Sequence, residues 1–236
     1  MFDKKKIKHG FAAAAILSCG LFFSCKNPDV PGLPKNNQKV IIGDSIFGLS
    51  GVEKLELAKL ALENSRGYAQ SGDTMAGITE QYGWAKNDGP IRTIVMDGGG
   101  NNVLLGGQSK CTAFDPADIQ ESCLEILHTA WDLGAVLLAR MHQDGVQDVL
   151  WQGYYHLPND LTKLNVALDI GVEGIRDICE DAPVNCHFVD VRPAFAGRPE
   201  LVKSDNIHPT DPGSKVLAQE VWKVMVAFGI EQNQPR

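Results

Sequence analysis

A short apolar run that leads straight into a glycine and a serine constrains this chain more than any other feature of its sequence. The run is Lys39–Ile42, Gly43-Asp44-Ser45 follows it, and a helical pattern begins immediately afterwards. A continuous apolar run that ends at a glycine predicts a buried strand of a parallel sheet. Because ligands and chemistry gather at the carboxyl ends of parallel strands, Ser45 is a candidate nucleophile. Taken alone, Gly-Asp-Ser is also a common turn sequence.

Strands and helices alternate along the rest of the chain. Asp115-Pro116 and Asp211-Pro212 each mark a helix start, because aspartate favours the N-cap and proline the first helical position. The alternation predicts βαβ units, and therefore a three-layer α/β/α sandwich around a central parallel sheet. The expected strands are Lys39–Ile42, Gly67–Gln70, Ile91–Met96, Asp148–Trp151 and His187–Val191, and the expected helices are Leu49–Asn64, Asp115–Gln143, Leu161–Cys179 and Asp211–Phe228.

The N-terminal residues 1–24 have the pattern of a secretory signal peptide. Four lysines precede a short apolar stretch, Phe11–Phe23, which is brief for a membrane span. The segment Leu21–Cys25 resembles a bacterial lipobox, which implies lipid attachment at Cys25. Cys19 is a competing site, but apolar residues follow it, whereas a polar, proline-bearing tether (residues 25–38) begins at Cys25. We therefore expect export to the periplasm or cell envelope with a lipid anchor in the membrane. An ordinary cleaved signal is the alternative.

The remaining residues are expected to form one domain, residues 39–230, followed by a polar tail, residues 231–236. Without residues 1–24 the chain carries 18 basic and 28 acidic residues, a formal charge of −10 against −7 for the whole sequence. Such a surface repels phosphate backbones, so nucleic acid is not an expected partner. The oligomeric state stays open.

Four cysteines lie in the expected domain: Cys111, Cys123, Cys179 and Cys186. An even number in an exported chain favours disulfides, and four cysteines allow three pairings. We favour the two local pairs, Cys111 with Cys123 and Cys179 with Cys186, because each brackets a junction between a loop and a regular element. Neither spacing is that of a zinc ribbon or a redox pair. Four buried thiols are the alternative.

The residues that could take part in a reaction share one edge of the predicted sheet. Ser45, Gly72 and Asn101 follow predicted strands, and Asp205 and His208 lie in the final loop. Together they supply a nucleophile, a base, an orienting carboxylate and donors for an oxyanion, which is what acyl transfer needs.

Four sequence blocks, in this order, resemble those of the SGNH hydrolases, the GDSL-type esterases and lipases. The blocks are Gly43-Asp44-Ser45, Ser71-Gly72-Asp73-Thr74, Gly99-Gly100-Asn101-Asn102 and Asp205-Asn206-Ile207-His208. The resemblance implies a flavodoxin-like fold and a hydrolase acting on ester bonds. Asn102 departs from the family, which usually has aspartate there, and we expect it to affect the hydrogen bonds of its loop more than the chemistry.

The expected roles follow from chemistry as well as from the resemblance. His208 can take the proton of the Ser45 hydroxyl, and Asp205 can orient and stabilise the imidazolium. The oxyanion would be held by the N–H groups of Ser45 and Gly72 and by the amide of Asn101. The G-x-S-x-G pattern is missing, which argues against the α/β-hydrolase fold.

Other readings of these residues are weaker. The glycines before Asn101 do not have dinucleotide-binding spacing, and no further Asp, Glu or His near Asp205 and His208 completes a metal site. We expect no cofactor. Among the other histidines, His156 is a candidate for substrate contact, and Trp131 is expected in the core with Leu137-Leu138.

The sequence thus predicts a serine esterase that works through an acyl-enzyme on Ser45. Its substrate could be a small ester, a thioester, an acylated carbohydrate or a lysolipid. An acyltransferase would use the same triad, since both reactions pass through one acyl-enzyme. A non-catalytic binding protein on the same fold is the remaining alternative.

Overall fold

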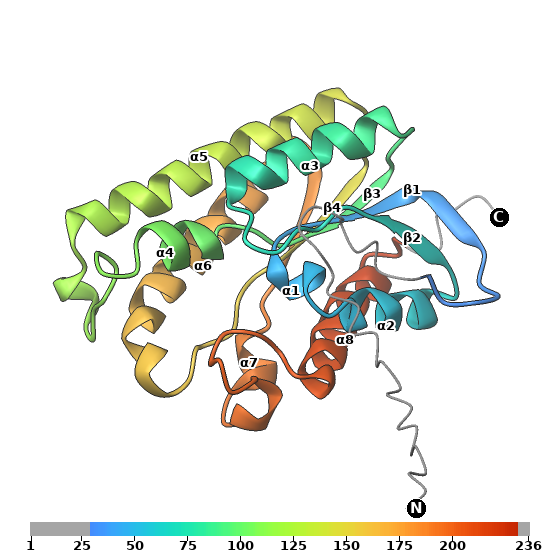
Figure 1. Ribbon diagram of the computed structural model, residues 1–236. Coiled ribbons are helices and arrows are strands. Elements are labelled where there is room, and N and C mark those ends of the chain that lie inside the picture. Colours follow the sequence, from blue (N-terminus) through green and yellow to red (C-terminus); the bar gives the residue numbers. More distant parts are fainter. Residues whose placement is uncertain (1–28, 231–236) are drawn as a thin grey trace, which may run out of the picture.

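The computed structural model describes residues 29–230. They form a five-stranded sheet with helices on either side (Figure 1). Three short 3₁₀ helices, Pro116–Asp118, Asn159–Leu164 and Pro199–Leu201, lie in the connections. The strands are β1 (Lys35–Ile42), β2 (Asn64–Gly67), β3 (Thr93–Met96), β4 (Asp148–Gln152) and β5 (Asn185–Val189). The α-helices are α1 (Ser45–Gly48), α2 (Val52–Ala61), α3 (Met75–Asn87), α4 (Gly100–Gly106), α5 (Glu121–Gln143), α6 (Asn165–Glu180), α7 (Arg192–Phe195) and α8 (Asp211–Ala227).

All strands of the sheet run parallel, in the order β2-β1-β3-β4-β5. The chain leaves β1 toward β2 on one side and returns on the other side with β3, so the strand order reverses between β1 and β3. Ligands bind in the crevice at such a switch point. The register pairs Ile42 with Met96, so the residues that follow these two strands emerge side by side.

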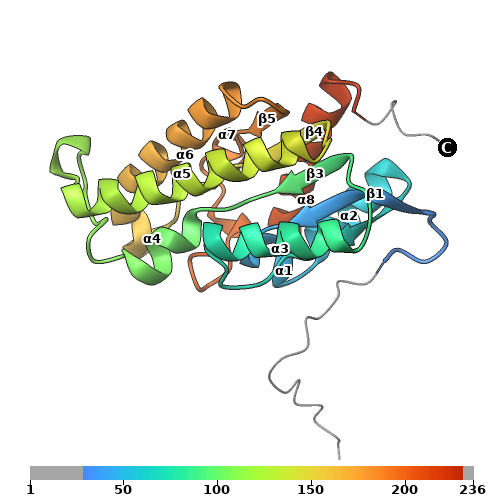
Figure 2. The ribbon, with the colours of Figure 1, turned by 90° about the horizontal axis from the view of Figure 1, so that it is seen from above.

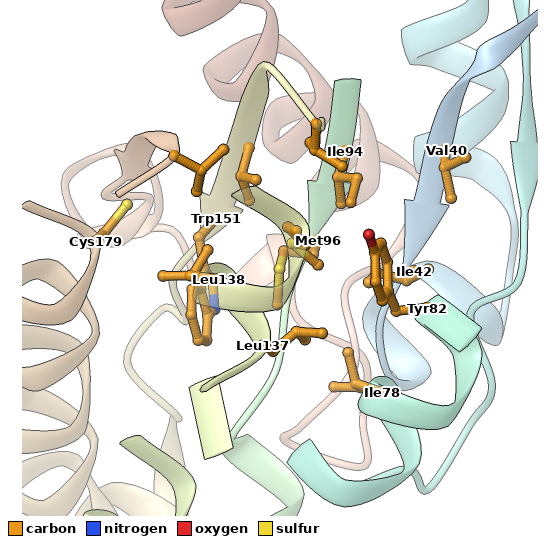
Figure 3. Packing of buried hydrophobic residues seen from close by; sticks show 14 of the residues in the cluster. Val40, Ile42, Ile78, Tyr82, Ile94, Met96, Leu137, Leu138, Trp151 and Cys179 are labelled. Atoms are coloured by element: carbon orange, nitrogen blue, oxygen red, sulfur yellow. The ribbon is translucent and has the colours of Figure 1, made fainter. Parts of the chain in front are cut away.

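Helices cover both faces of the sheet and form two separate cores, which confirms the predicted α/β/α sandwich. Helices α3, α5 and α6 lie on one face, and α2 and α8 on the other (Figures 1 and 2). On the first face, side chains from β1, β3 and β4 meet Tyr82 of α3 and Leu137 and Leu138 of α5 (Figure 3). On the second face Ile41, Val95 and Leu150 pack against α1, α2 and α8.

Helix α5 is the one described helix that is long and apolar enough to cross a membrane. One such helix is weak evidence of a span, because the core helix of a globular domain passes the same test. Here Leu137, Leu138 and Met141 are buried on the sheet-facing side. The expected core position of Leu137-Leu138 is therefore confirmed.

Several expected boundaries are wrong, and polar residues explain most of the errors. Strand β1 begins at Lys35, so the last residues of the expected tether (25–38) belong to the sheet. Strand β2 covers Asn64–Gly67 instead of Gly67–Gln70, because its polar side chains are buried and paired. Asn64 donates to the carbonyl groups of Val30 and Leu33 at 3.0 and 3.1 Å. Strand β5 likewise begins two residues before the expected His187.

The helices also differ in detail from the expectation. The helix expected over Leu49–Asn64 is shorter and corresponds to α2, and the two helices expected from Asp115 and Leu161 each begin with a 3₁₀ turn. Helices α1, α3, α4 and α7 have no counterpart in the expectation. Thr210, rather than Asp211, caps α8, because its hydroxyl accepts from the N–H of Gly213 at 3.2 Å.

Both predicted disulfides are present. Cys111 is bonded to Cys123, and Cys179 to Cys186. The first closes the connection between α4 and α5, and the second ties the end of α6 to β5. The signal peptide (residues 1–24), the lipidation residue Cys25 and the polar tail (231–236) lie outside the described residues, so export and anchoring stay predictions.

Candidate active site

The turn that carries Ser45 follows β1 at the switch point. Register places it beside the end of β3, where Asp97 follows Met96. Gly43 has a φ of +147°, and a Cβ there would collide with the carboxylate of Asp97, so only glycine fits. Ser45 is the first residue of α1, and its N–H has no helical carbonyl to bond. The turn therefore presents the Ser45 hydroxyl together with a backbone N–H of the first helical turn.

Ser45, His208 and Asp205 form one chain of hydrogen bonds. His208 Nε2 lies 3.0 Å from the Oγ atom of Ser45, and its Nδ1 lies 2.8 Å from Oδ2 of Asp205. Residues separated by 163 positions in sequence thus meet as predicted. The order nucleophile, imidazole and carboxylate is the one that activates a serine for attack.

Asp205 is held as a carboxylate by its own loop. Its Oδ1 accepts from the N–H groups of Ile207 and His208 at 3.0 and 2.9 Å. Partial burial raises the pKa of Asp205, but these two hydrogen bonds and the imidazole outweigh it and lower the pKa to about 2. The loop is anchored by Tyr155, whose hydroxyl donates to the carbonyl of Ile207 at 2.6 Å. The carboxylate therefore stays charged and fixed opposite the imidazole.

The glycine and asparagine blocks meet beside this triad. Asn101 is buried, and its side-chain amide donates to the carbonyl of Asp73 at 3.0 Å. Asn102 accepts from the N–H of Met75 at 3.1 Å, at the first residue of α3, so it joins the asparagine block to that helix. That it matters less for the chemistry than Asn101 stays a prediction. Gly72 has a φ of +89°, a conformation that favours glycine.

Gln81, on α3, joins the first two blocks and was not predicted. Its amide makes two hydrogen bonds of 2.8 Å to the backbone N–H and carbonyl of Gly43. The same amide nitrogen lies 2.6 Å from Oδ2 of Asp73. Gln81 is completely buried, so it fixes the position of the turn that carries Ser45 relative to the glycine block.

Two buried carboxyl groups, those of Asp44 and Asp97, lie next to the turn that carries Ser45. Asp44 accepts from Ile46 N–H at 3.0 Å and from the Tyr154 hydroxyl at 2.7 Å, and its own N–H donates to Oδ1 of Asp97 at 2.6 Å. Burial raises the pKa of Asp44, and burial followed by the charge of Asp44 raises the pKa of Asp97 well above its usual range. Asp97 was not predicted, although it ends an apolar strand at the chemically active edge.

An apolar cavity opens at Ser45 and extends between α4, α5 and α6. Trp131, expected in the core, is only partly buried and lines this cavity. His156 does not line it: its Nε2 lies 2.8 Å from Asp169, and its side chain is 53% exposed. The expected substrate contact of His156 therefore finds no support in this cavity and stays a prediction. Within residues 29–230, no three His, Cys, Asp or Glu side chains gather as a metal site would require.

Solved structures share this architecture, although no protein-family model and no curated protein matches the chain. A protein from Slackia heliotrinireducens assigned to the SGNH hydrolases has a TM-score of 0.59 and 18% identity, covering 79% of this chain and 97% of its own. A variant of an acetylxylan esterase from Geobacillus stearothermophilus has a TM-score of 0.61 and 15% identity, covering 82% of this chain and 95% of its own. A lipase from a goat rumen metagenome, Lip_vut3, has a TM-score of 0.62 and 16% identity, covering 79% of this chain and 96% of its own. The chain therefore has the fold of the SGNH hydrolases.

Proposed function

We propose that this protein is a serine esterase that hydrolyses a carboxylic ester through an acyl-enzyme on Ser45. The observation that carries the proposal is the continuous hydrogen-bond chain from Ser45 through His208 to Asp205. Its polar atoms stand at the switch point of a parallel sheet, next to a cavity large enough for a ligand.

In the first half of the reaction, Ser45 Oγ forms a bond to the carbonyl carbon of the ester while its proton moves to His208 Nε2. Asp205 stabilises the imidazolium from the Nδ1 side and stays ionised. The imidazolium then gives the proton to the alcohol oxygen as the bond between the carbonyl carbon and that oxygen breaks. The alcohol leaves, and the acyl group remains on Ser45.

In the second half, His208 takes a proton from water as the water oxygen attacks the acyl carbon. Return of the proton to Ser45 Oγ releases the carboxylic acid. In both halves a negative charge develops on the carbonyl oxygen. We assign its stabilisation to the N–H groups of Ser45 and Gly72 and to the Asn101 amide, which can use its second hydrogen while the first remains on Asp73.

The similar structures support ester hydrolysis as a class. Their names include an acetylxylan esterase and a lipase, so acylated carbohydrates and lipid esters are both candidate substrates. An acyltransferase would form the same acyl-enzyme and pass the acyl group to an alcohol in place of water.

The test compares Ser45→Ala with Ser50→Ala on p-nitrophenyl esters. Ser50 is a nearby serine whose Oγ accepts from Val52 N–H at 3.3 Å at the start of α2. Triad losses measured in another serine hydrolase reach about a millionfold in kcat, so we expect Ser45→Ala to be inactive and Ser50→Ala to be active. A fluorophosphonate should label the unmodified protein once, and peptide mapping should place the label on Ser45. Retention of more than about one per cent of activity by folded Ser45→Ala would contradict the proposal, since it would mean another nucleophile.

A further inference from the structure

The cavity beside Ser45 is more apolar than a small acyl group requires, and it reaches from Ser45 to α5 and α6. About 70 Å³ inside it is open to the centres of water-sized molecules, which is room for several waters. Ser45 and Asn101 line its polar end together with Tyr154 and Tyr155. The space that would receive the substrate is therefore continuous with the nucleophile.

Beyond this polar end, helices supply apolar walls. Helix α4 contributes Val103 and Leu104, α5 contributes Leu127, and α6 contributes Leu168 and Ile175. The same region forms a separate apolar cluster that includes the Cys111–Cys123 disulfide, so a covalent link holds the α4–α5 connection against the cavity. Water in such a space has few polar partners, whereas an alkyl chain would contact every wall.

The indole nitrogen of Trp131 makes its hydrogen bond to another residue of the cavity wall. Its Nε1 donates to the carbonyl of Gly171 at 3.1 Å. A Cβ at Gly174 would collide with the indole ring, so a glycine on α6 makes room for it. The hydrogen bond satisfies the nitrogen and leaves the rest of the ring as an apolar surface. A hydroxyl-rich ligand such as a sugar would find no partner there.

The position of the cavity relative to His208 indicates which part of an ester it takes. The imidazole must deliver a proton to the alcohol oxygen, so the alcohol has to lie on the His208 side of Ser45. The loop of Asp205 and His208 reaches the cavity through Ile207, but neither His208 nor Asp205 is among the described residues that line it. Gly98–Asn101, on the side assigned to the carbonyl oxygen, do line it.

We propose that the cavity between α4, α5 and α6 binds the acyl chain, so that the substrate is an ester of a medium-chain fatty acid. This inference rests on the proposed function. Each methylene transferred from water into the cavity contributes up to about a fourfold increase in kcat/KM. An octanoyl group has six more methylenes than an acetyl group, so we expect octanoate to exceed acetate by at least about tenfold.

Two pairs of substrates and two variants test the proposal. The first pair is p-nitrophenyl octanoate and p-nitrophenyl acetate. The second is ethyl octanoate and octyl acetate, isomers in which the eight-carbon part is the acid in one and the alcohol in the other. Leu168→Trp fills the cavity and should lower the octanoate-to-acetate ratio at least about tenfold. Val136→Trp, on the exposed side of α5 (66% exposed), should leave that ratio unchanged. Leu104→Trp replaces Leu168→Trp if the latter fails to fold.

Each outcome has a definite meaning. Preference for octanoate and for ethyl octanoate, lost in Leu168→Trp alone, supports the acyl-chain assignment. Faster hydrolysis of acetate than of octanoate overturns it while leaving the esterase proposal intact. Faster hydrolysis of octyl acetate than of ethyl octanoate overturns it too, because the chain would then lie on the alcohol side. If no ester is hydrolysed and the fluorophosphonate does not react, the proposed function fails, and this inference fails with it.

Discussion

Glu53→Gln is expected to stabilise the protein, and to do so more as the pH rises. Glu53, on α2, is completely buried, and neither oxygen has a hydrogen-bond partner within the described part of the chain. The amide oxygen of Gln152 is likewise buried and unpartnered. Burial raises the pKa of Glu53 well above its usual range; nearby Gln152 opposes this, and the charge of Asp44 adds to it.

The direction in which stability changes with pH follows from proton binding by Glu53. A carboxyl whose pKa is higher in the folded protein keeps its proton there after the unfolded chain has lost it, near pH 4.3. Stability is therefore greatest below that pH and falls as the pH rises toward the folded pKa, by at most about 1.4 kcal/mol per pH unit. A glutamine at position 53 does not ionise, and its amide can donate to the Gln152 oxygen.

The size of the effect can be bounded from the unsatisfied group. An unpaired buried polar group typically costs about 1–3 kcal/mol in proteins. For a domain of this size each kcal/mol shifts Tm by about 2–4 °C, so the gain at pH 8 should be about 2–12 °C. At pH 5 the protonated Glu53 can itself donate, and the difference from glutamine should nearly vanish.

The measurement is thermal unfolding of the wild type and the variant at several pH values between 5 and 8. Glu56→Gln is the matched control on the same helix, since Glu56 is partly exposed and pairs with Lys59. It should shift stability by no more than about 0.5 kcal/mol at any of these pH values. A Glu53→Gln variant that is destabilised, or whose advantage does not grow with pH, would refute the reasoning.

Two further predictions concern the site and its surroundings. Asn101→Ala should lower kcat by about a hundredfold or more with little change in KM, whereas Asn102→Asp should change activity only a few fold. A larger kinetic loss at position 102 than at position 101 would mean that the alignment of this block is wrong by one residue. Asn102→Asp should also raise Tm by about 1–4 °C, because a negative charge would then face the N-terminus of α3 at Met75. Replacing Cys111 and Cys123 by serine should cost about 3 kcal/mol in thermal unfolding, from a sequence separation of 12 residues, and an unchanged Tm would show that the disulfide does not stabilise the domain.

The fold was predictable where hydropathy follows burial. The inner strands β3 and β4 are runs of apolar residues buried on both faces, and both were found nearly at their observed bounds. The edge strand β2, in contrast, differs from its expected bounds. Its Arg66 is buried, and the guanidinium donates to the carbonyls of Ala85 and Pro90 at 2.8 and 2.9 Å. A paired, buried arginine is indistinguishable in sequence from an exposed one.

Helix α3 was missed for a related reason. Gly77 and Gly83 interrupt the apolar periodicity that predicts a helix. Gly77 is required by packing, since a Cβ there would lie 2.6 Å from the Asp73 carboxyl carbon. The feature that weakens the helical pattern is therefore what lets the helix approach the glycine block, and Gln81 on the same helix reaches the nucleophile turn from that position.

The residues of the site, and the buried Glu53 outside it, differ in how far the sequence reveals them. Ser45, Asp205 and His208 follow strands or stand in a loop, where a reactive side chain is unusual enough to be noticed. Gln81 and Glu53 stand inside helices, where polar residues are ordinary, and only the packing shows that both are completely buried. The cavity walls are the hardest part to predict from the sequence, because leucines at helical spacing predict a core whether that core is filled or hollow. The motifs therefore predict the class of reaction, whereas the acyl group that reacts depends on how closely α4, α5 and α6 pack, which no motif records.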